Sequence, residues 1–414
     1  MKKLFLVFVL ILLLFLITPV KALSPLHIEG RYIKDENNNT VVLRGVNWGE
    51  FASSCTGRFI TPGEMTPAGF NVWDEATVRA HLQGMKDWGV NVIRTQGQLE
   101  WWIYNSSTTL TGQATNRPFR ESYKDFLRLA EEYEFYVVLT WYSISPGGGQ
   151  DVLPYPPFSH TDGGRVITSK QDFIDAWVDI ATELKDYPNL IFELWNEPAP
   201  GLTAVVQDWF YTMQDCIDAI RATGADNIII PHLGYCTDVN WVQNPEWGWD
   251  KSVNCYLNGT NLLFSGHIYR FHSSFDNNKN CPVDYEYIKS KIESPESWPD
   301  GLCYKKVLEE RNVPLFVGEI GGWYRTDITC PSPCTDENES VFFANALRVL
   351  NELGISYTAW VMQQETWSGF SLQLHEPAVQ GPNENGLILI NALRGEYPVN
   401  ITGIVTDSDT GLPI

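Results

Sequence analysis

Two glutamates stand near the ends of apolar runs and could act together as a catalytic pair. Residues 190–198 read Leu-Ile-Phe-Glu-Leu-Trp-Asn-Glu-Pro and include Glu197, and residues 314–322 read Pro-Leu-Phe-Val-Gly-Glu-Ile-Gly-Gly and include Glu319. Short apolar runs that lead into turn-forming residues are typical of buried strands. Two carboxyl groups that different strands bring to one opening can cleave a glycosidic bond: one protonates the leaving oxygen, and the other attacks or stabilises the sugar cation. Either glutamate alone could equally be an ordinary polar residue at a strand end.

Strand-like runs and helical patterns alternate along most of the chain. Eight apolar runs are typical of strands: 41–48, 90–96, 136–142, 190–196, 227–232, 262–268, 314–319 and 355–362. Amphipathic patterns typical of helices include 77–88, 121–134, 170–186, 203–223 and 340–353. Continuous apolar strands with helices between them indicate a parallel sheet covered by helices, and eight such units close a barrel. The sequence therefore predicts an α/β fold, a (β/α)8 TIM barrel.

Long loops and an N-terminal hairpin complete the predicted barrel. Four loops that follow predicted strands are rich in proline, glycine, asparagine and aromatic residues: 49–71, 143–165, 234–261 and 270–297. Loops in this position build the C-terminal face of a barrel, where active sites lie, so we expect them to wall a cleft. We also expect 27–33 and 40–43, joined around 35–39, to form a hairpin that plugs the opposite end of the barrel.

Further polar and aromatic residues fall at the ends of different predicted strands. They are Arg94, Asn196, His267, Tyr269 and Trp360. An arginine inside a barrel is costly unless it is paired, whereas an arginine beside a glutamate would keep that carboxylate ionised. Other roles stay open, because Tyr269 and Trp360 could be core aromatic residues and His267 could be a structural histidine.

With these residues the chain resembles glycoside hydrolase family 5, a large family of β-glycanases that includes many cellulases and mannanases. The resemblance runs from about residue 33 to residue 362. It rests on the motif Asn196-Glu197-Pro198, the segment around Glu319, Arg94, the His267-x-Tyr269 pair and Trp360. It implies that Glu197 is the general acid/base and that Glu319 is the nucleophile of a double displacement.

The resemblance also implies roles for the supporting residues. Arg94 and Tyr269 would hydrogen-bond the nucleophile and keep it ionised. Asn196 would bind the sugar 2-hydroxyl group, a contact that strengthens in the transition state. His267 would orient groups around the site, and Trp360 would form the floor under the sugar that is cleaved.

One position departs from the family pattern. Members usually carry a histidine at the end of the third strand, where this chain has Tyr142, with Trp141 as the second choice for the same place. A tyrosine hydroxyl group can bind a sugar oxygen, but it does not titrate near neutral pH. His160, on the following loop, is another candidate for the missing histidine. The departure therefore concerns contacts with the substrate more than the chemical step.

Tryptophan is abundant, with 16 residues in 414. Several stand where a predicted strand gives way to a loop, and Trp48 is the first of them. Flat aromatic faces bury a large apolar area against a sugar ring. We therefore expect Trp48 to contribute to the binding of substrate.

The ends of the chain differ from the predicted barrel. Residues 1–22 combine two early lysines, a long apolar run and the sequence Val20-Lys21-Ala22, a pattern typical of a cleaved signal peptide, with a retained anchor as the alternative. Residues 23–396 would form the catalytic domain. Residues 397–414 would be the stub of a following β-sandwich module, or a C-terminal tail that ends in an edge strand.

Charge and cysteine content narrow the environment of the protein. The net charge is −21, and it becomes −24 without residues 1–22, which hold three lysines and no acidic residue. Such a charge argues against nucleic acids and anionic membranes as partners. Eight cysteines in an exported chain suggest disulfide bonds. Candidate pairs are Cys330–Cys334, Cys281–Cys303 and Cys236–Cys255, whereas Cys216 lies in a helical pattern and could be a buried thiol.

These observations predict a secreted, monomeric, retaining β-glycanase, and an endo-β-1,4-glucanase (cellulase) is the first choice. Its partner would be a β-linked polysaccharide, with no nucleic acid, no membrane beyond the signal segment, and no metal or organic cofactor implied. The alternatives are a β-1,4-mannanase, a catalytically inactive glycan-binding protein, and a transferase that uses the same covalent intermediate.

Overall fold

The structure is a computed structural model, and it describes the segments that form the barrel and its helices. The described residues are 23–48, 73, 75–105, 117–142, 153–156, 167–198, 203–231, 257–270, 283–294, 302, 304–306, 308–309, 312–322, 336–362 and 381–397. The predicted signal peptide (1–22), His160, most of the predicted C-terminal stub and all candidate disulfide cysteines lie outside them. Cys216 is described, and it is a buried free thiol, as predicted.

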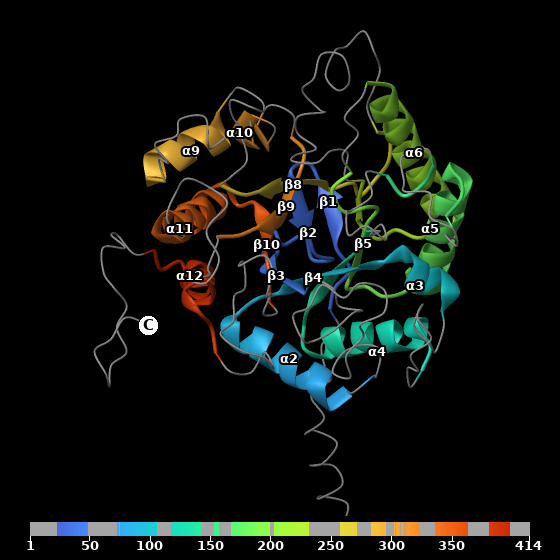
Figure 1. Cartoon of the computed structure of the whole chain (residues 1–414), viewed down its shortest axis with the longest axis horizontal. Coiled ribbons are helices and arrows are strands. Elements are labelled where there is room, and N and C mark those ends of the chain that lie inside the picture. The colour runs from blue at the N-terminus through green and yellow to red at the C-terminus, as the bar shows by residue number, and fades with distance from the viewer. Residues whose placement is uncertain are drawn as a thin grey trace, which may run out of the picture.

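Eight parallel strands form the centre of the fold (Figure 1). They are β3 (Arg44–Trp48), β4 (Val92–Gln98), β5 (Tyr136–Tyr142), β6 (Leu190–Glu193), β7 (Ile229–Ile230), β8 (Phe264–Ile268), β9 (Leu315–Ile320) and β10 (Ser356–Ala359). Their order in the sheet is β7-β6-β5-β4-β3-β10-β9-β8. A parallel bridge between Ile229 and Leu262 joins the two ends of this sheet. The nearly closed barrel confirms the predicted fold class.

Helices surround the barrel and pack on its outer face (Figure 1). They are α2 (Glu75–Trp88), α3 (Leu99–Tyr104), α4 (Phe119–Glu132), α5 (Lys170–Leu184), α6 (Thr203–Ala222), α9 (Tyr285–Glu293), α10 (Tyr304–Lys306), α11 (Asp336–Leu353) and α12 (Glu384–Leu393). The five predicted helices are confirmed to within a few residues. The prediction of a loop at 270–297 was wrong in part, because it contains α9. This helix begins where the Asp284 side chain caps the Tyr287 backbone N–H, and it buries only Ile288 and Ile292.

Alternation along each strand separates two apolar layers. Val137 and Leu139 of β5 face outward and belong to the large cluster between barrel and helices. Val138, between them, faces inward and belongs to a smaller cluster inside the barrel, together with Val92 and Phe316. The inward cluster occupies the N-terminal ends of the strands. The C-terminal half of the barrel interior is thereby left to polar side chains.

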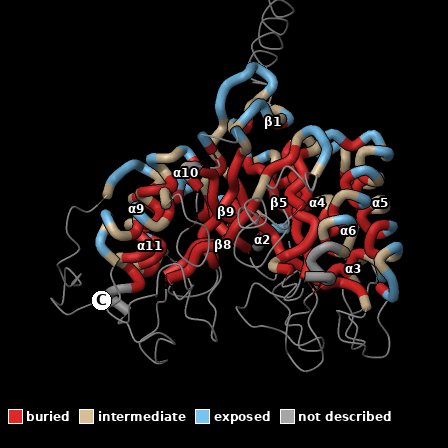
Figure 2. Tube along the Cα trace, turned by 90° about the horizontal axis from the view of Figure 1, so that it is seen from above, coloured by how far each residue is buried: buried red, intermediate tan, exposed pale blue. Residues whose placement is uncertain are grey.

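The N-terminal hairpin covers the base of the barrel, but its turn differs from the predicted one. Strands β1 (His27–Glu29) and β2 (Tyr32–Lys34) pair antiparallel around Gly30, whose positive φ of 58° suits a glycine. The predicted turn at 35–39 exists, but it is closed by the isolated bridge between Lys34 and Thr40. Ile33 packs into the inward cluster, so the hairpin does plug the base, and Figure 2 shows β1 at that end of the molecule.

A bulge in β9 interrupts the alternation at Gly318. In the pairing of β9 with β8, Gly266 lies opposite Val317, but the next residue, His267, lies opposite Glu319. The pairing of β9 with β10 shows a shift of register at the same place. One extra residue therefore stands in β9, and such a bulge redirects the side chains that follow it. Without the bulge, Glu319 would share the outward face of Val317. With it, Glu319 turns into the barrel.

Among the described residues, no helix has the length and apolar composition of a membrane span.

Candidate active site

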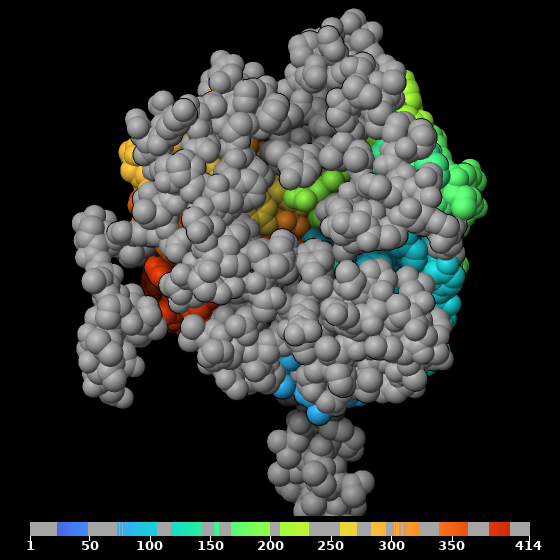
Figure 3. Space-filling model, viewed as in Figure 1, coloured from blue at the N-terminus to red at the C-terminus, as the bar shows by residue number. Residues whose placement is uncertain are grey.

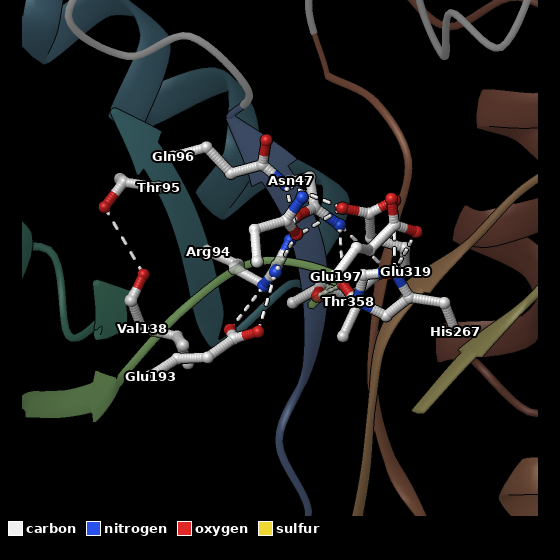
Figure 4. A network of polar contacts seen from close by, with 12 residues as sticks. Asn47, Arg94, Thr95, Gln96, Val138, Glu193, Glu197, His267, Glu319 and Thr358 are labelled. Carbon is white, nitrogen blue, oxygen red and sulfur yellow. Dashed lines mark hydrogen bonds and ion pairs between the residues drawn. The ribbon is translucent and has the colours of Figure 1, made fainter. Parts of the chain in front are cut away.

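Arg94 occupies the centre of a polar network inside the C-terminal half of the barrel (Figure 4). Its side chain is completely buried. All five of its N–H groups have acceptors. The bonds run from Nε to Glu193 Oε2 (2.6 Å), from Nη2 to Glu193 Oε1 (2.8 Å) and Asn196 Oδ1 (2.7 Å), and from Nη1 to Asn47 Oδ1 (2.9 Å) and Glu319 Oε1 (3.0 Å).

Two buried carboxylates compensate the charge of Arg94. Burial by itself would lower the pKa of the guanidinium group, but the charges of Glu193 and Glu319 and their hydrogen bonds raise it instead. Glu193 is fully buried on the inward face of β6 and accepts two of the five bonds. The prediction that Arg94 pairs with a glutamate is confirmed, and the main partner is one that the sequence reading missed.

Glu319 is surrounded by hydrogen-bond donors. Oε1 accepts from Arg94 and from Gln96 Nε2, which lies at 2.6 Å, and Oε2 accepts from the Tyr269 hydroxyl group at 2.8 Å. Burial alone would raise the pKa of this carboxyl group, but the charges of His267 and Arg94 and the bonds from Tyr269 and Arg94 hold it below its usual value. Glu319 is therefore ionised at neutral pH, as a nucleophile must be.

Glu197 lies opposite Glu319, with His267 between them. His267 Nδ1 is 2.7 Å from Glu197 Oε1 and 3.5 Å from Glu319 Oε2. The backbone of Glu197 has a positive φ of 44°, a conformation that residues other than glycine adopt rarely and that is often found at functional sites. The preceding residue, Asn196, donates its backbone N–H to the carbonyl group of Trp141 at 2.8 Å, which ties this turn to the end of β5.

One carboxyl oxygen each of Glu197 and Glu319 and one nitrogen of His267 lie within 4.8 Å of one another. Within the described part of the chain, this is the group that could hold a metal ion. Among these three groups, His267 Nδ1 and Glu197 Oε1 form a hydrogen bond at 2.7 Å, and Glu319 Oε2 lies 3.5 Å from the same nitrogen. The close approach of the two carboxyl groups is what the cleavage of a glycosidic bond by a nucleophile and an acid requires.

Two predicted residues stand at the rim of this network. Trp360 follows β10 and is 8% exposed, and its backbone N–H donates to the carbonyl group of Ile320 at the end of β9. Tyr142 is the last residue of β5, and by alternation it shares the inward face of Val138 and Thr140. Trp141 points outward and packs against Trp102 of α3 and Phe119 of α4. Tyr142, and not Trp141, therefore occupies the inward position at the end of this strand.

The prediction that Trp48 faces the substrate site was wrong, because its side chain points out of the barrel. Its ring stacks on His81 of α2 at 5.1 Å, meets Phe126 of α4 at 5.9 Å, and is 1% exposed. The physical reason is the alternation of β3, in which Trp48 shares the outward face of Val46. Asn47, its neighbour, turns inward and donates from Nδ2 to the carbonyl group of Gly318 at 2.9 Å.

The sequence reading missed four members of the network. They are Asn47, Gln96, Glu193 and Thr358. Each lies an even number of residues from an inward-facing residue of the same strand. The alternation of side chains along a strand could therefore have predicted that it faces into the barrel. The carbonyl group of Gly318, which the bulge turns out of the sheet ladder, accepts from both Asn47 and Thr358. These two side chains thus stabilise the backbone that presents Glu319.

The network opens toward one face of the molecule. In Figure 3, residues coloured green, gold and orange remain visible at the centre of this face, and the bar assigns these colours to the segments that include β6, β8 and β9. Glu319 lies on β9 and His267 on β8, and Glu197 lies in the turn that follows β6. The site is therefore at the centre of the face, as in other barrels of this kind.

Comparison with known proteins supports the same family. The chain is 26% identical to the cellulase CelDZ1 of a Thermoanaerobacterium species over 203 residues, which are 47% of this chain and 43% of that protein. It is 28% identical to an endoglucanase of Bacillus sp. (strain KSM-635) over 195 residues, 44% of this chain and 17% of that one. The chain thus spans less than half the length of these curated relatives.

Solved structures share the fold. An endocellulase from Pyrococcus horikoshii in complex with cellotetraose superposes with a TM-score of 0.62 at 16% identity, over 90% of this chain and 99% of the other. A β-mannanase from Streptomyces thermolilacinus with mannohexaose gives 0.55 at 15% identity, over 91% and 97%. The model of the family "Cellulase (glycosyl hydrolase family 5)" matches residues 35–366, most of the chain. With this match and the paired glutamates in place, the chain belongs to glycosyl hydrolase family 5.

Proposed function

We propose that the protein is a retaining β-glycanase that acts as an endo-β-1,4-glucanase on cellulose or soluble β-glucan. One observation carries the proposal: an ionised, donor-bound Glu319 faces Glu197 with carboxyl oxygens no more than 4.8 Å apart. Carboxyl groups about 5–5.5 Å apart are typical of retaining enzymes, because an inverting enzyme needs space for a water molecule between acid and base.

In the first step, a carboxylate oxygen of Glu319 attacks the anomeric carbon while Glu197 gives its proton to the departing glycosidic oxygen. The bond to the leaving sugar breaks, and an ester forms between the remaining sugar and Glu319. In the second step, Glu197, now ionised, removes a proton from a water molecule whose oxygen attacks the anomeric carbon. The bond between this carbon and Glu319 breaks, and Glu319 leaves as a carboxylate. His267, at 2.7 Å from Glu197, orients this carboxyl group in both steps.

Asn196 supports the proposal by the orientation of its amide group. Its Oδ1 accepts from Arg94 Nη2 at 2.7 Å, so the carbonyl end of the amide faces the guanidinium group and Nδ2 points the other way. In this orientation, Nδ2 is the atom that would meet the 2-hydroxyl group of a sugar. Trp360 and Tyr142, at the ends of their strands, would then contact the same sugar from other sides.

A β-1,4-mannanase is the second candidate, because a β-mannanase is among the proteins that share the fold. Glucose and mannose differ in the configuration at carbon 2, and the site contacts this position through Asn196. Initial rates on carboxymethyl cellulose and on galactomannan separate the two candidates. We expect faster release of reducing ends from the cellulose derivative, and a higher rate on galactomannan would reverse the assignment.

The stereochemistry of the product tests the mechanism. Proton NMR during the first minutes of hydrolysis should show the β-anomer of the new reducing end before it equilibrates. Early α-anomer would mean inversion and would contradict the proposed role of Glu319. A protein without turnover on any β-glycan would be a glycan-binding protein, and products longer than the substrate would indicate a transferase.

Secretion and a monomeric state belong to the same proposal. The pattern of residues 1–22 and the acidic net charge of −21 suit an exported protein that acts on a neutral polymer. N-terminal sequencing of secreted protein should begin after Ala22, and material that begins at Met1 would contradict cleavage. Sedimentation at several concentrations tests the monomer.

A further inference from the structure

Gln96 is a buried amide in contact with the nucleophile. It stands two residues after Arg94 on the inward face of β4 and is 5% exposed. Its Nε2 lies 2.6 Å from Glu319 Oε1 and 3.2 Å from Asn196 Oδ1, so both of its hydrogens have acceptors within the site (Figure 4). The mechanism described above gives this side chain no role.

We propose that Gln96 is a positioning residue of the hydrolysis, which fixes Asn196 against Glu319 and determines that Oε2 of Glu319 attacks the sugar. The inference rests on the proposed function. It adds a residue that acts through the two groups it bridges and does not touch the substrate itself.

The count of donors on Glu319 supports this choice of oxygen. Oε1 accepts from Arg94 Nη1 at 3.0 Å and from Gln96 at 2.6 Å, and these bonds use both of its lone pairs. Oε2 accepts from Tyr269 at 2.8 Å, with His267 Nδ1 at the longer distance of 3.5 Å. Oε2 therefore keeps an electron pair for the anomeric carbon, and Oε1 becomes the carbonyl oxygen of the ester.

A neutral donor suits both states of Glu319. The charged or titratable groups that face Glu319 are Arg94 on β4, Glu197 after β6, His267 on β8 and Tyr269 directly after β8. When the ester forms, Glu319 loses its charge, and a second cation at the place of Gln96 would be left without a counter-charge. An amide instead keeps a hydrogen bond to the ester carbonyl oxygen. That bond strengthens when the carboxylate charge returns in the second step, so Gln96 helps the carboxylate to leave.

The test compares two glutamines of one strand. Gln96→Met removes the donor and keeps the length of the side chain, and Gln98→Met is the matched control. Gln98 lies two residues further along β4 with 3% exposure, and no described contact links its side chain to the network. The substrate is 2,4-dinitrophenyl β-cellobioside, whose good leaving group makes hydrolysis of the ester the slow step. Thermal unfolding shows that each variant is folded.

We expect Gln96→Met to lower kcat by about 10- to 100-fold, the effect of one hydrogen bond to a charged group, while kcat/KM falls less. The glycosyl-enzyme should accumulate, as mass spectrometry of quenched protein can show. The acid limb of kcat/KM should also move to higher pH, because Glu319 loses a donor that favours its ionised form. Gln98→Met should behave like the wild type in all three measurements.

A second variant keeps the inference testable if Gln96→Met does not fold. Gln96→Glu retains the shape but places a carboxyl group beside Glu319, so the acid limb should move to higher pH still. Equal kcat and equal pH profiles for the wild type and for the Gln96 variants would overturn the inference and leave the proposed function intact. Absence of turnover by the wild type on every β-glycan would overturn both.

Discussion

Arg94 binds Glu193 through two nitrogens, at 2.6 and 2.8 Å, but binds Glu319 through one, at 3.0 Å. This bidentate contact fixes the plane of the guanidinium group, because two parallel N–H···O bonds hold the planar cation and the carboxylate in one plane. The orientation of the cation is therefore set by Glu193, which binds a different edge of the guanidinium group from the one that reaches Glu319. Glu319 can lose its charge to an ester and regain it while Arg94 stays in place.

Glu193→Gln should destabilise the protein and lower its activity. The amide N–H₂ group would face the donors of Arg94, and a buried charge that loses its partner costs about 3–5 kcal/mol. Chemical denaturation should show a loss of that order, and kcat should fall because Arg94 is no longer fixed. Glu132→Gln, which breaks an exposed pair with Arg79, should leave the unfolding free energy almost unchanged. Equal stability of the two variants would contradict this role of Glu193.

Tyr269→Phe should move the acid limb of kcat/KM to higher pH. The hydroxyl group donates to Glu319 Oε2 at 2.8 Å and contributes to the lowered pKa of that carboxyl group. A glutamate nucleophile with a lowered pKa is active above that pKa and becomes inactive as pH falls through it, so the wild-type limb should lie below the usual pKa of a glutamate.

The same shift affects stability in the same direction. The lowered pKa of Glu319 stabilises the folded state above the usual glutamate pKa, and this contribution is lost as pH falls through the lowered value. Tyr269→Phe should therefore reduce the difference in stability between neutral and acidic pH. Titration of kcat/KM and of thermal unfolding, both from pH 3 to pH 7, measures the two effects; an unmoved acid limb would mean that Tyr269 does not bind the ionised nucleophile.

Gly318→Ala should reduce catalysis more than stability. A Cβ atom at this position would lie 2.9 Å from His267 Nε2 and 3.2 Å from Ser265 Oγ, so the imidazole must shift and its contact with Glu197 must change. A displacement on the order of 1 Å near the reacting groups can cost about 100-fold in rate. Gly354→Ala is the control: its positive φ of 67° makes alanine strained there, but no atom lies within 4 Å. It should lower the melting temperature and leave kcat unchanged.

The barrel could be predicted because its signals are periodic and local. Apolar runs and amphipathic helices gave the strand and helix positions, and β5 matches its predicted range of 136–142. Glu319 was identified from its motif and not from alternation, since alternation alone would turn it outward with Val317. The bulge that turns it inward depends on Gly318 and on side chains from β3 and β10, contacts between residues distant in sequence.

The residues around Glu197 and Glu319 were harder to predict than the two glutamates themselves. Trp48 ends a strand, and for this reason it is predicted to bind sugar. Successive side chains of a strand point to opposite faces, however, so only one of two neighbours can face the site. In β3 this residue is Asn47. Glu193 is hidden in sequence because it lies within an otherwise apolar run. An arginine inside a barrel requires enough buried acceptors for its five donors, and this requirement could have drawn attention to Glu193 and Gln96.

Glu197→Ala and Glu319→Ala should fail in different ways, which identifies the two roles. Without Glu319, no glycosyl-enzyme can form, and activity should fall by several powers of ten on all substrates. Without Glu197, an aryl glycoside whose leaving group needs no proton still forms the ester. The ester then accumulates, because no base activates water.

The anomer that forms with azide shows which face of the sugar is accessible in each variant. In Glu197→Ala, azide should attack the ester from the side of the missing acid/base and give the β-glycosyl azide. In Glu319→Ala, it should enter through the space of the missing nucleophile and give the α-glycosyl azide. NMR of the products distinguishes the two anomers. If Glu197→Ala gave the α-azide and Glu319→Ala the β-azide, the two roles would have to be exchanged. Full activity of both variants would place the catalytic site elsewhere in the chain.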